Sequence, residues 1–235
     1  MGMPIVVDVR DDCGDQVLDE LFDWFREVDE RFSTYKTGSE ISRLNRGELH
    51  IRDCHPDVRW VLARCDELRD ETDGYFDAEA ASAGGLDPSG LVKGWSVERA
   101  AAILDERGCS SYAINAGGDV LVRGGERRRI GIQHPLLANA VCSVIELTDG
   151  AVATSGAYAR GDHVLDPHTG EPPRGVLSVT VVGPELGTVD AYATAAFAMG
   201  MRAPRWTARL PRGYQAMTIL ADETVLTTPG FPAAA

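Results

Sequence analysis

Long hydrophobic runs are missing from this sequence. Of its 235 residues, 44% are hydrophobic and 25% are charged, yet no apolar stretch approaches the roughly 18 to 20 residues that a membrane-spanning helix needs. The chain also opens without a basic segment followed by an apolar one, which is the pattern of a secretory signal peptide. We therefore expect a cytoplasmic protein with no transmembrane segment, folded as a single domain over residues 1–235.

Positive charge is scarce as well. The chain has 23 Lys and Arg against 36 Asp and Glu, which gives a net charge of −13. Binding to the phosphate backbone of nucleic acids depends on clustered Lys and Arg, so the composition argues against nucleic acid as the main partner. To bind a small anionic ligand, the protein would need a local region of positive charge within this negative electrostatic field.

Cysteine is present but without pattern. The five residues Cys13, Cys54, Cys65, Cys109 and Cys142 are odd in number, widely spaced and free of the C-x-x-C motif. Disulfide frameworks and zinc sites both have characteristic spacings, and neither is indicated here. We expect reduced thiols with structural roles.

Helical periodicity dominates the first half of the chain and strand patterns dominate the second. Apolar residues recur at helical spacing over 15–31 and 56–72, and a third helix is expected at about 95–107, after a glycine-punctuated turn at 86–94. Strands are expected at 5–9, 111–115, 119–123, 129–133, 141–147, 151–154, 177–182 and 217–220. This segregation predicts an α+β fold of mixed, mostly antiparallel sheets flanked by helices.

One further helix carries two oxygen donors. The stretch from Thr188 to Gly200 is rich in alanine, with Thr188 expected as the N-cap and Gly200 as the residue that ends the helix. Asp190 and Thr194 are four positions apart, so their side chains lie one turn apart on the same face. A carboxylate and a hydroxyl suit Mg²⁺, whose shell is completed by water and substrate phosphates. The alternative is that Asp190 only complements the helix dipole and Thr194 only packs.

Four other stretches combine glycine with polar side chains. Residues 87–94 bring backbone amides next to a lysine at the mouth of a helix, an arrangement suited to phosphate and a metal ion. Residues 115–119 form a glycine turn that either lets a ligand approach closely or simply connects two strands. Residues 154–160 offer hydroxyls and a cation, and residues 163–170 offer an imidazole beside a turn. The G-x-x-x-x-G-K-[ST] and G-x-G-x-x-G phosphate-binding motifs are absent.

Taken in order, these stretches closely resemble the ApbE family, the FAD:protein FMN transferases, and the resemblance covers nearly the whole chain. Motifs similar to those of the family occur in the family's order: Met1-Gly2-Met3 (M-G-T), residues 32–35 with 39–45 (flavin-side loop), Phe76-Asp77 (F-D), residues 87–94 (D-x-x-G-x-x-K-G), residues 115–119 (N-A-G-G-D), Thr154-Ser155-Gly156 (T-S-G), His163-x-x-Asp166-Pro167-x-x-Gly170 (H-x-x-D-P) and Asp190-Ala191-x-x-Thr194 (metal-binding). The family's ApbE-like fold is expected to follow.

The resemblance implies a bound Mg²⁺ and FAD as the substrate. It places the metal on Asp190, Thr194 and a main-chain oxygen near Gly90. It places the flavin with its ribityl and phosphate groups against Met1, Tyr35, Tyr75, Phe76, Asp77, Asp87, Lys93, Gly117, Gly118, Ser155 and Leu165. A divalent cation would also resolve the difficulty of binding a pyrophosphate to an acidic protein.

The reaction implied is transfer of FMN from FAD to a Thr or Ser hydroxyl of a target flavoprotein, with release of AMP. The acceptor would carry a D-x-x-[ST]-G-A-[ST] motif. His163 is the expected general base, since imidazole titrates nearest neutral pH; the alternative is that it only orders its loop. Two other functions stay open: a Mg²⁺-dependent FAD pyrophosphatase that frees FMN and AMP, and a non-catalytic flavin-binding protein.

The sequence departs from the family in two places. The segment between Asp77 and Asp87 is shorter than is usual in the family, so part of the wall around the ligand is expected to be reduced, which affects flavin affinity and acceptor choice. The chain also starts at the first core motif, without the signal peptide or lipoprotein cysteine common among relatives. For this reason, the expected target is a cytoplasmic protein or the cytoplasmic side of a membrane protein.

Overall fold

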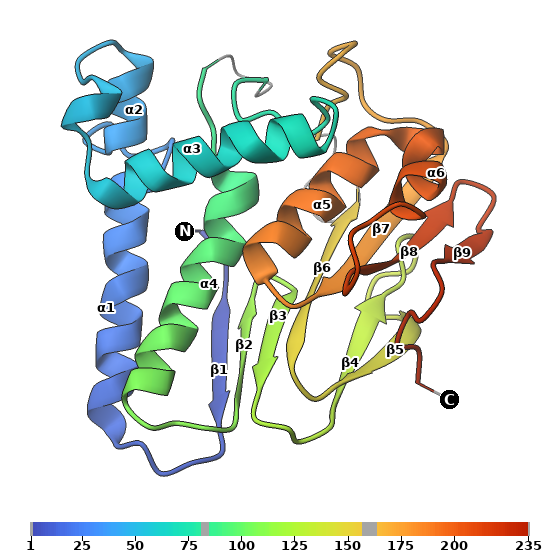
Figure 1. Cartoon of the computed structure of the whole chain (residues 1–235), viewed down its shortest axis with the longest axis horizontal. Helices are drawn as coiled ribbons and strands as arrows, with labels where there is room; N and C mark the ends of the chain where they lie inside the picture. Colours follow the sequence, from blue (N-terminus) through green and yellow to red (C-terminus); the bar gives the residue numbers. More distant parts are fainter. Residues whose placement is uncertain (1, 81–84, 157–163, 235) are drawn as a thin grey trace.

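A seven-stranded antiparallel sheet forms the centre of the protein (Figure 1). The computed structural model describes residues 2–80, 85–156 and 164–234. The strands lie in the order β1-β2-β3-β6-β7-β8-β9, and each neighbouring pair is antiparallel. Their bounds are β1 Ile5–Val9, β2 Tyr112–Ala116, β3 Asp119–Arg123, β6 Gly150–Gly156, β7 Val176–Gly183, β8 Gln215–Leu220 and β9 Val225–Thr227. A separate antiparallel pair consists of β4 (Arg128–Gln133) and β5 (Val141–Leu147).

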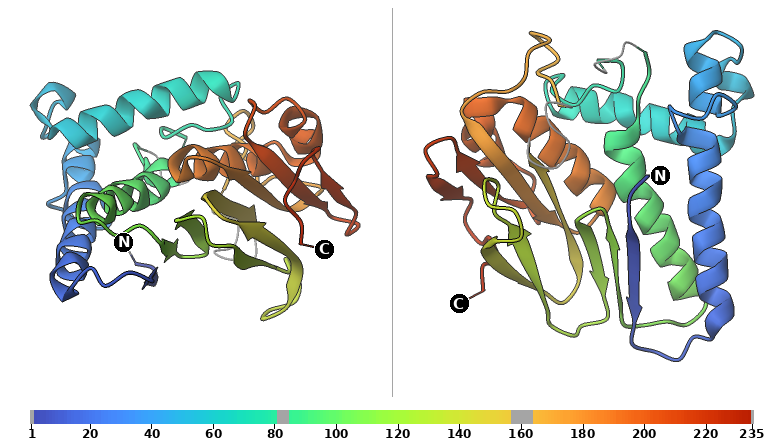
Figure 2. Two further views of the ribbon diagram at one scale, coloured as in Figure 1. Left: turned by 60° about the horizontal axis from the view of Figure 1, so that its bottom comes forward. Right: turned by 180° about the vertical axis from the view of Figure 1, so that it is seen from behind.

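The helices cover one face of this sheet, and the β4–β5 pair covers the other (Figure 2). The helices are α1 Asp15–Phe32, α2 Glu40–Asn45, α3 Pro56–Glu71, α4 Ser89–Glu106, α5 Leu186–Ala198 and α6 Ala203–Thr207, with short 3₁₀ turns at Ile51–Asp53 and Gly200–Arg202. α5 packs on β6 and β7, and α4 packs against both α5 and α1. None of these helices is long and apolar enough to cross a lipid bilayer.

Buried apolar side chains form one cluster on each side of the sheet. The larger cluster joins the helices to the sheet, and the smaller one joins the sheet to β4 and β5. Successive residues of β3 belong to opposite clusters: Leu121 to the larger, and Val120 and Val122 to the smaller. Because side chains alternate along a strand, a strand buried on both faces needs an unbroken apolar run. This explains the continuous hydrophobic stretches in the second half of the sequence.

The predicted α+β class with mostly antiparallel strands is confirmed. The helices at 15–31 and 56–72 and the strands expected from sequence are present, most with ends shifted by one or two residues. β9 was not predicted, because its three residues are exposed and lie at the edge of the sheet. A strand so short and so exposed leaves no hydrophobic alternation to detect.

The glycine-rich stretch 87–94 is largely helical, which corrects the expectation of a turn. α4 begins at Ser89, well before the expected start at 95. A Cβ at Gly94 would lie 2.5 Å from the carbonyl oxygen of Leu186, so this glycine allows α4 and α5 to cross at very short distance. Asp87 Oδ1 accepts a hydrogen bond from the Ser89 N–H (3.0 Å) where the helix starts. Lys93 therefore projects from a regular helix and not from a loop.

α5 also begins earlier than expected, so the prediction that Thr188 is its N-cap is wrong. The helix starts at Leu186, and Glu98 on α4 accepts a hydrogen bond from the Gly187 N–H (3.0 Å), replacing a local cap. Thr188 is buried, and its hydroxyl donates to Glu185 (3.1 Å). The other end agrees with the prediction: Gly200 follows the helix with a φ of +56°.

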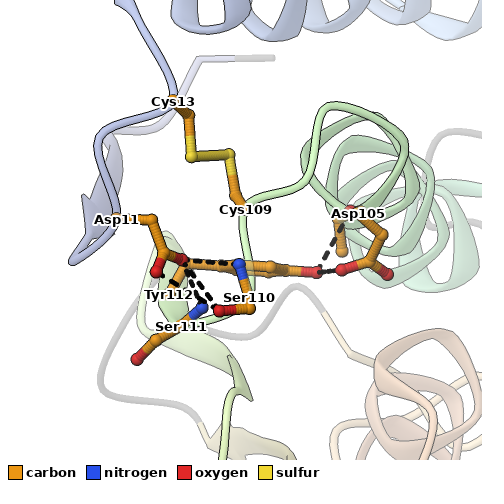
Figure 3. The surroundings of a disulfide bond; sticks show 8 residues. Asp11, Cys13, Asp105, Cys109, Ser110, Ser111 and Tyr112 are labelled. Carbon is orange, nitrogen blue, oxygen red and sulfur yellow. Dashed lines mark hydrogen bonds between the residues drawn. A yellow bond between two sulfur atoms is a disulfide. The ribbon is translucent and has the colours of Figure 1, made fainter.

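Cys13 and Cys109 form a disulfide (Figure 3), so the expectation of reduced thiols is wrong for these two residues. The same two segments are joined by the carboxylate of Asp11, which accepts hydrogen bonds from the N–H groups of Ser110 (2.5 Å) and Ser111 (2.7 Å). The fold thus brings the chain before α1 next to the chain after α4. A pairing across 96 residues leaves no trace in cysteine spacing.

Thiol labelling under three conditions tests the disulfide. Cys142 is exposed, whereas burial raises the pKa of Cys54 to about 11 and that of Cys65 to about 12, and protonated thiols react slowly. We expect a maleimide to label one cysteine in the folded protein, three after denaturation without reductant and five only with reductant. Labelling of all five cysteines in denatured, unreduced protein would contradict the pairing.

Gly94→Ala tests the close crossing of α4 and α5. The added methyl group must push apart two helix backbones, so we expect a loss of about 1 to 3 kcal/mol in the free energy of unfolding, measured by urea denaturation. Gly38→Ala is the matched control, because no atom lies within 4 Å of a Cβ at that position; its effect should stay within about 0.5 kcal/mol. Equal midpoints for the two variants would show that the helices have room to separate.

Candidate active site

α5 presents two oxygen-bearing side chains toward β6 and α4. Asp190 is only 2% exposed. Thr194, one turn later, has its hydroxyl 3.3 Å from the hydroxyl of Ser155 on β6. The expectation that Asp190 and Thr194 share a face is confirmed, because their neighbours come from the same side of the helix. Since α5 packs on β6 and β7, a rigid framework holds both groups.

A lysine and a second carboxylate complete the group. Lys93 on α4 places its ammonium nitrogen 2.5 Å from Asp119 Oδ2 and 3.3 Å from Asp190 Oδ1. Asp119 is the first residue of β3, and its Oδ1 accepts a hydrogen bond from the backbone N–H of Thr154 (3.3 Å). The side chains of both aspartates are 3% exposed and that of Lys93 is 23% exposed. Two carboxylates and one ammonium thus share an interior site with a formal charge of −1.

The electrostatics of this group favour an additional cation. Burial raises the pKa of Asp190 to about 7, against the opposing effect of the Lys93 charge. Burial alone would lower the pKa of Lys93, but the charges of Asp190 and Asp119 outweigh it and raise this pKa, so the ammonium stays protonated. Asp190 Oδ2 is buried and has no hydrogen-bond partner within the described ranges. A buried polar atom left unpaired in this way marks a place where an ion or water belongs.

The donor set fits Mg²⁺. Asp190 Oδ2 and the Thr194 hydroxyl are hard oxygen ligands, and Mg²⁺ typically uses one or two carboxylates together with water and phosphate oxygens. In the part of the chain that the structure describes, no group of three or more His, Cys, Asp or Glu side chains could enclose a metal ion. The two oxygen donors suit a cation that shares its shell with a phosphate ligand.

The first turn of α4 reaches the same place. A Cβ at Gly90 would lie 3.0 Å from Cε2 of Phe76 and 3.9 Å from Cγ2 of Thr194. Gly90, Phe76 and Thr194 are therefore close neighbours, although they come from three different segments. The main chain near Gly90, expected as a metal donor, therefore lies beside Thr194, one of the other two expected ligands. A side chain at position 90 would crowd the Phe76 ring.

Tyr75 is held by two side chains from later in the sequence. Its hydroxyl accepts a hydrogen bond from Arg202, and its ring meets that of His168 edge-on with centroids 4.5 Å apart. His168 also makes a hydrogen bond through Nε2 with the carbonyl oxygen of Asp73 (3.0 Å). These contacts hold the chain just before Phe76, so Tyr75 has structural partners in addition to its predicted flavin contact.

Asp77 and Asp87 border the segment that is expected to be short. Asp77 Oδ1 accepts a hydrogen bond from the Glu79 N–H (2.8 Å), and Oδ2 lies 3.6 Å from Nε of Arg69. Asp87 holds the start of α4, and its own N–H donates to the carbonyl oxygen of Ala78 (2.7 Å). The two aspartates therefore lie at the base of one loop, and both have local structural roles.

The remaining predicted residues divide into three groups. Gly117 and Gly118 form the β2–β3 turn with φ of +61° and +103°, directly before Asp119. Tyr35 is 96% exposed, and Leu165 is half-buried after β6. Met1 and His163 lie outside the described residues. The roles of these six residues stay predictions.

Sequence reasoning assigned no role to Asp119 or His168. Asp119 was visible as the last residue of the N-A-G-G-D motif, but only its glycines were taken as ligand contacts. The signal available was an acidic residue at the start of an otherwise apolar strand. His168 could not have been found, because its partners Asp73 and Tyr75 lie more than 90 residues earlier in the chain.

A separate hollow lies on the opposite face of α5. It has a volume of about 460 Å³ and is lined by residues that include Arg64, Thr188, Tyr192, Trp206 and Tyr214. It contains none of the predicted site residues. Thr188 and Tyr192 point into it from α5, whereas Asp190 and Thr194 point to the sheet side. The predicted metal ligands of α5 and this hollow therefore lie on different faces of the helix.

The fold and this oxygen-rich, lysine-containing group define an α+β protein with a candidate site for a divalent cation and an anion. A sequence model described as "ApbE family" matches residues 1–84 and 79–218. The chain belongs to the ApbE family.

The structural comparisons agree on the fold. The flavin transferase ApbE from Vibrio cholerae superposes with a TM-score of 0.83 at 22% identity, covering 98% of this chain and 95% of that one. The ApbE protein from Thermotoga maritima gives the same TM-score and identity, covering 97% and 93%. The predicted ApbE-like fold is therefore confirmed.

The sequence comparisons are with curated proteins named FAD:protein FMN transferase. The protein from Vibrio cholerae is 36% identical over 129 residues, which is 49% of this chain and 39% of that protein. The protein from Haemophilus influenzae is 26% identical over 242 residues, covering 74% of this chain and 70% of that protein. Several of these matches span less than two fifths of the relative's length.

Metal titration of variants on α5 tests the site directly. Asp190→Asn removes the buried carboxylate, so we expect Mg²⁺ affinity, measured by isothermal titration calorimetry, to fall by at least about 100-fold; Thr194→Val should cost about tenfold. Thr188→Val is the matched control, because Thr188 lies on the opposite face of the same helix. A loss as large in Thr188→Val as in Thr194→Val would show that the effect comes from the helix and not from a ligand.

Proposed function

We propose that this protein is a Mg²⁺-dependent FAD:protein FMN transferase. It transfers FMN from FAD to a Thr or Ser hydroxyl of a flavoprotein with a D-x-x-[ST]-G-A-[ST] motif, and releases AMP. The single observation that carries the proposal is the unpaired buried oxygen of Asp190, which lies beside Lys93 and on the same face as Thr194. Family membership supplies the flavin chemistry, and this oxygen supplies the place for the cation.

The residues have distinct tasks in the proposed reaction. Asp190, Thr194 and the main chain near Gly90 hold the metal ion, which when bound supplies positive charge to the pyrophosphate. The Lys93 ammonium adds a second positive charge at the same place. Phe76, packed against Gly90, closes the site on one side and excludes water from it.

The transfer itself exchanges one phosphorus–oxygen bond for another. The acceptor hydroxyl oxygen attacks the phosphorus on the FMN side of the pyrophosphate, and its proton passes to an imidazole nitrogen of His163, the proposed base. The bond from that phosphorus to the bridging oxygen breaks, and AMP leaves with the oxygen and the bonding electrons. Little covalent help from the protein is required, because such reactions depend on alignment and charge neutralisation. We place the reaction in the cytoplasm.

Incubation with FAD, Mg²⁺ and a purified acceptor domain tests this function. We expect a fluorescent acceptor band on a denaturing gel and AMP in equal amount. His163→Ala should lose transfer and keep FAD binding, because the base acts only on the attacking hydroxyl. An acceptor with its motif hydroxyl removed is the control and should remain unlabelled.

Each other result identifies a different function. AMP and free FMN without a labelled acceptor would indicate the pyrophosphatase, in which water replaces the hydroxyl. FAD that stays bound and intact for hours with Mg²⁺ would indicate a flavin carrier. Full transfer by His163→Ala would remove the proposed base while leaving the transferase intact.

A further inference from the structure

The Lys93 ammonium lies next to Asp190, the carboxylate that is expected to bind the cation. It lies 3.3 Å from Asp190 Oδ1, on the same carboxylate whose Oδ2 is buried and unpaired. A cation on Asp190 and an ammonium on Asp190 repel each other strongly in an interior of low dielectric. The site can therefore hold both charges only if Lys93 has another place to go.

Asp119 offers that place. Its Oδ2 is already 2.5 Å from the Lys93 nitrogen, nearer than Asp190. Its Oδ1 accepts a hydrogen bond from the backbone N–H of Thr154. Asp119 is also the first residue of β3, directly after the two-glycine turn, so its main chain is held in the sheet. A 3% exposed side chain held in this way has little freedom to rotate. Asp119 is thus a fixed counter-ion for Lys93 that does not depend on Asp190.

We propose that Asp119 is a positioning residue that holds the Lys93 ammonium away from Asp190 and so keeps that carboxylate available for the cation. The charges are consistent with this role. The three groups sum to −1 without a cation and to +1 with a divalent one, and an excess of +1 suits an anionic pyrophosphate. Without Asp119, Lys93 and Asp190 neutralise each other and the attraction for a cation is lost.

This inference rests on the proposed function for the identity of the anion, but it makes a separate claim about residues. The Asp119 side chain contacts the Lys93 ammonium and the backbone N–H of Thr154, and in this proposal it acts on the cation through Lys93. The effect of changing Asp119 must therefore depend on whether Lys93 is present. A residue that acted only by its negative charge would have the same effect in both cases.

A double-mutant cycle on Mn²⁺ affinity tests this dependence. Mn²⁺ is titrated without FAD and followed by electron paramagnetic resonance in the wild type, Asp119→Asn, Lys93→Met and the double variant. We expect Asp119→Asn alone to weaken Mn²⁺ binding about tenfold, as is common for groups behind metal ligands. In the Lys93→Met background, the same change should alter the affinity by less than about threefold.

Asp149→Asn is the matched control. Asp149 accepts a hydrogen bond from the Gly124 N–H at the far end of β3, so this change removes the same charge without touching Lys93. Its Mn²⁺ affinity should equal that of the wild type. Urea unfolding of each variant checks that the fold is kept.

The outcomes are distinguishable. An equal loss of affinity for Asp119→Asn in both backgrounds, or no loss in either, would overturn the positioning role while leaving the transferase proposal intact. No Mn²⁺ binding by the wild type would contradict the metal site itself, and with it both proposals. If Lys93→Met does not fold, Asp119→Glu takes its place: it keeps the charge and shifts it, so a loss of affinity supports positioning and wild-type affinity overturns it.

Discussion

The contact of one buried ammonium with two buried carboxylates is the interaction on which the rest of this structure depends. Lys93, Asp119 and Asp190 come from α4, β3 and α5, and none of these charges could remain in the interior without the others. Their meeting requires α4 to lie against α5 and α5 to lie on the sheet. Gly94 permits the first contact, and Glu98 ties α4 to the start of α5 across the same interface.

This arrangement is not one that stability alone would select. An apolar trio of similar volume would avoid the cost of burying three charges, and Asp190 Oδ2 has no partner within the described residues. Proteins retain such unfavourable buried charges at functional sites, where the binding of a ligand offsets the free-energy cost of burial. The apolar surroundings are otherwise well formed, with the alanines of α5 and most residues of β6 and β7 buried. The unfavourable burial of charge is therefore local to Lys93, Asp119 and Asp190, and these three residues belong to three of the motifs shared with the family.

Much of the fold could be predicted because its signals are local. The apolar faces of α1 and α3 and the continuous hydrophobic strands follow from short-range periodicity. What failed depended on contacts between distant segments: the start of α5 is set by Glu98 from another helix, and the helical state of Ser89 to Gly94 is set by packing against Leu186. The disulfide between Cys13 and Cys109 is of the same kind.

The site was predictable in its parts and not in its assembly. The spacing of Asp190 and Thr194 was enough to place them on one face, and the motif order was enough to name Lys93 and Gly90. No spacing rule could show that Lys93 pairs with Asp119, because helix and strand meet only in the folded chain. Tyr35, which is named by the resemblance alone, is 96% exposed, and its predicted flavin contact stays a prediction.

The most direct test of this account is the location of a bound cation. Crystals soaked in Mn²⁺ allow the ion to be found by its anomalous scattering. The account predicts a peak about 2.1 Å from Asp190 Oδ2 and close to the Thr194 hydroxyl, with the Lys93 ammonium remaining on Asp119. A peak elsewhere on this acidic protein, with Lys93 still bridging both carboxylates, would contradict it.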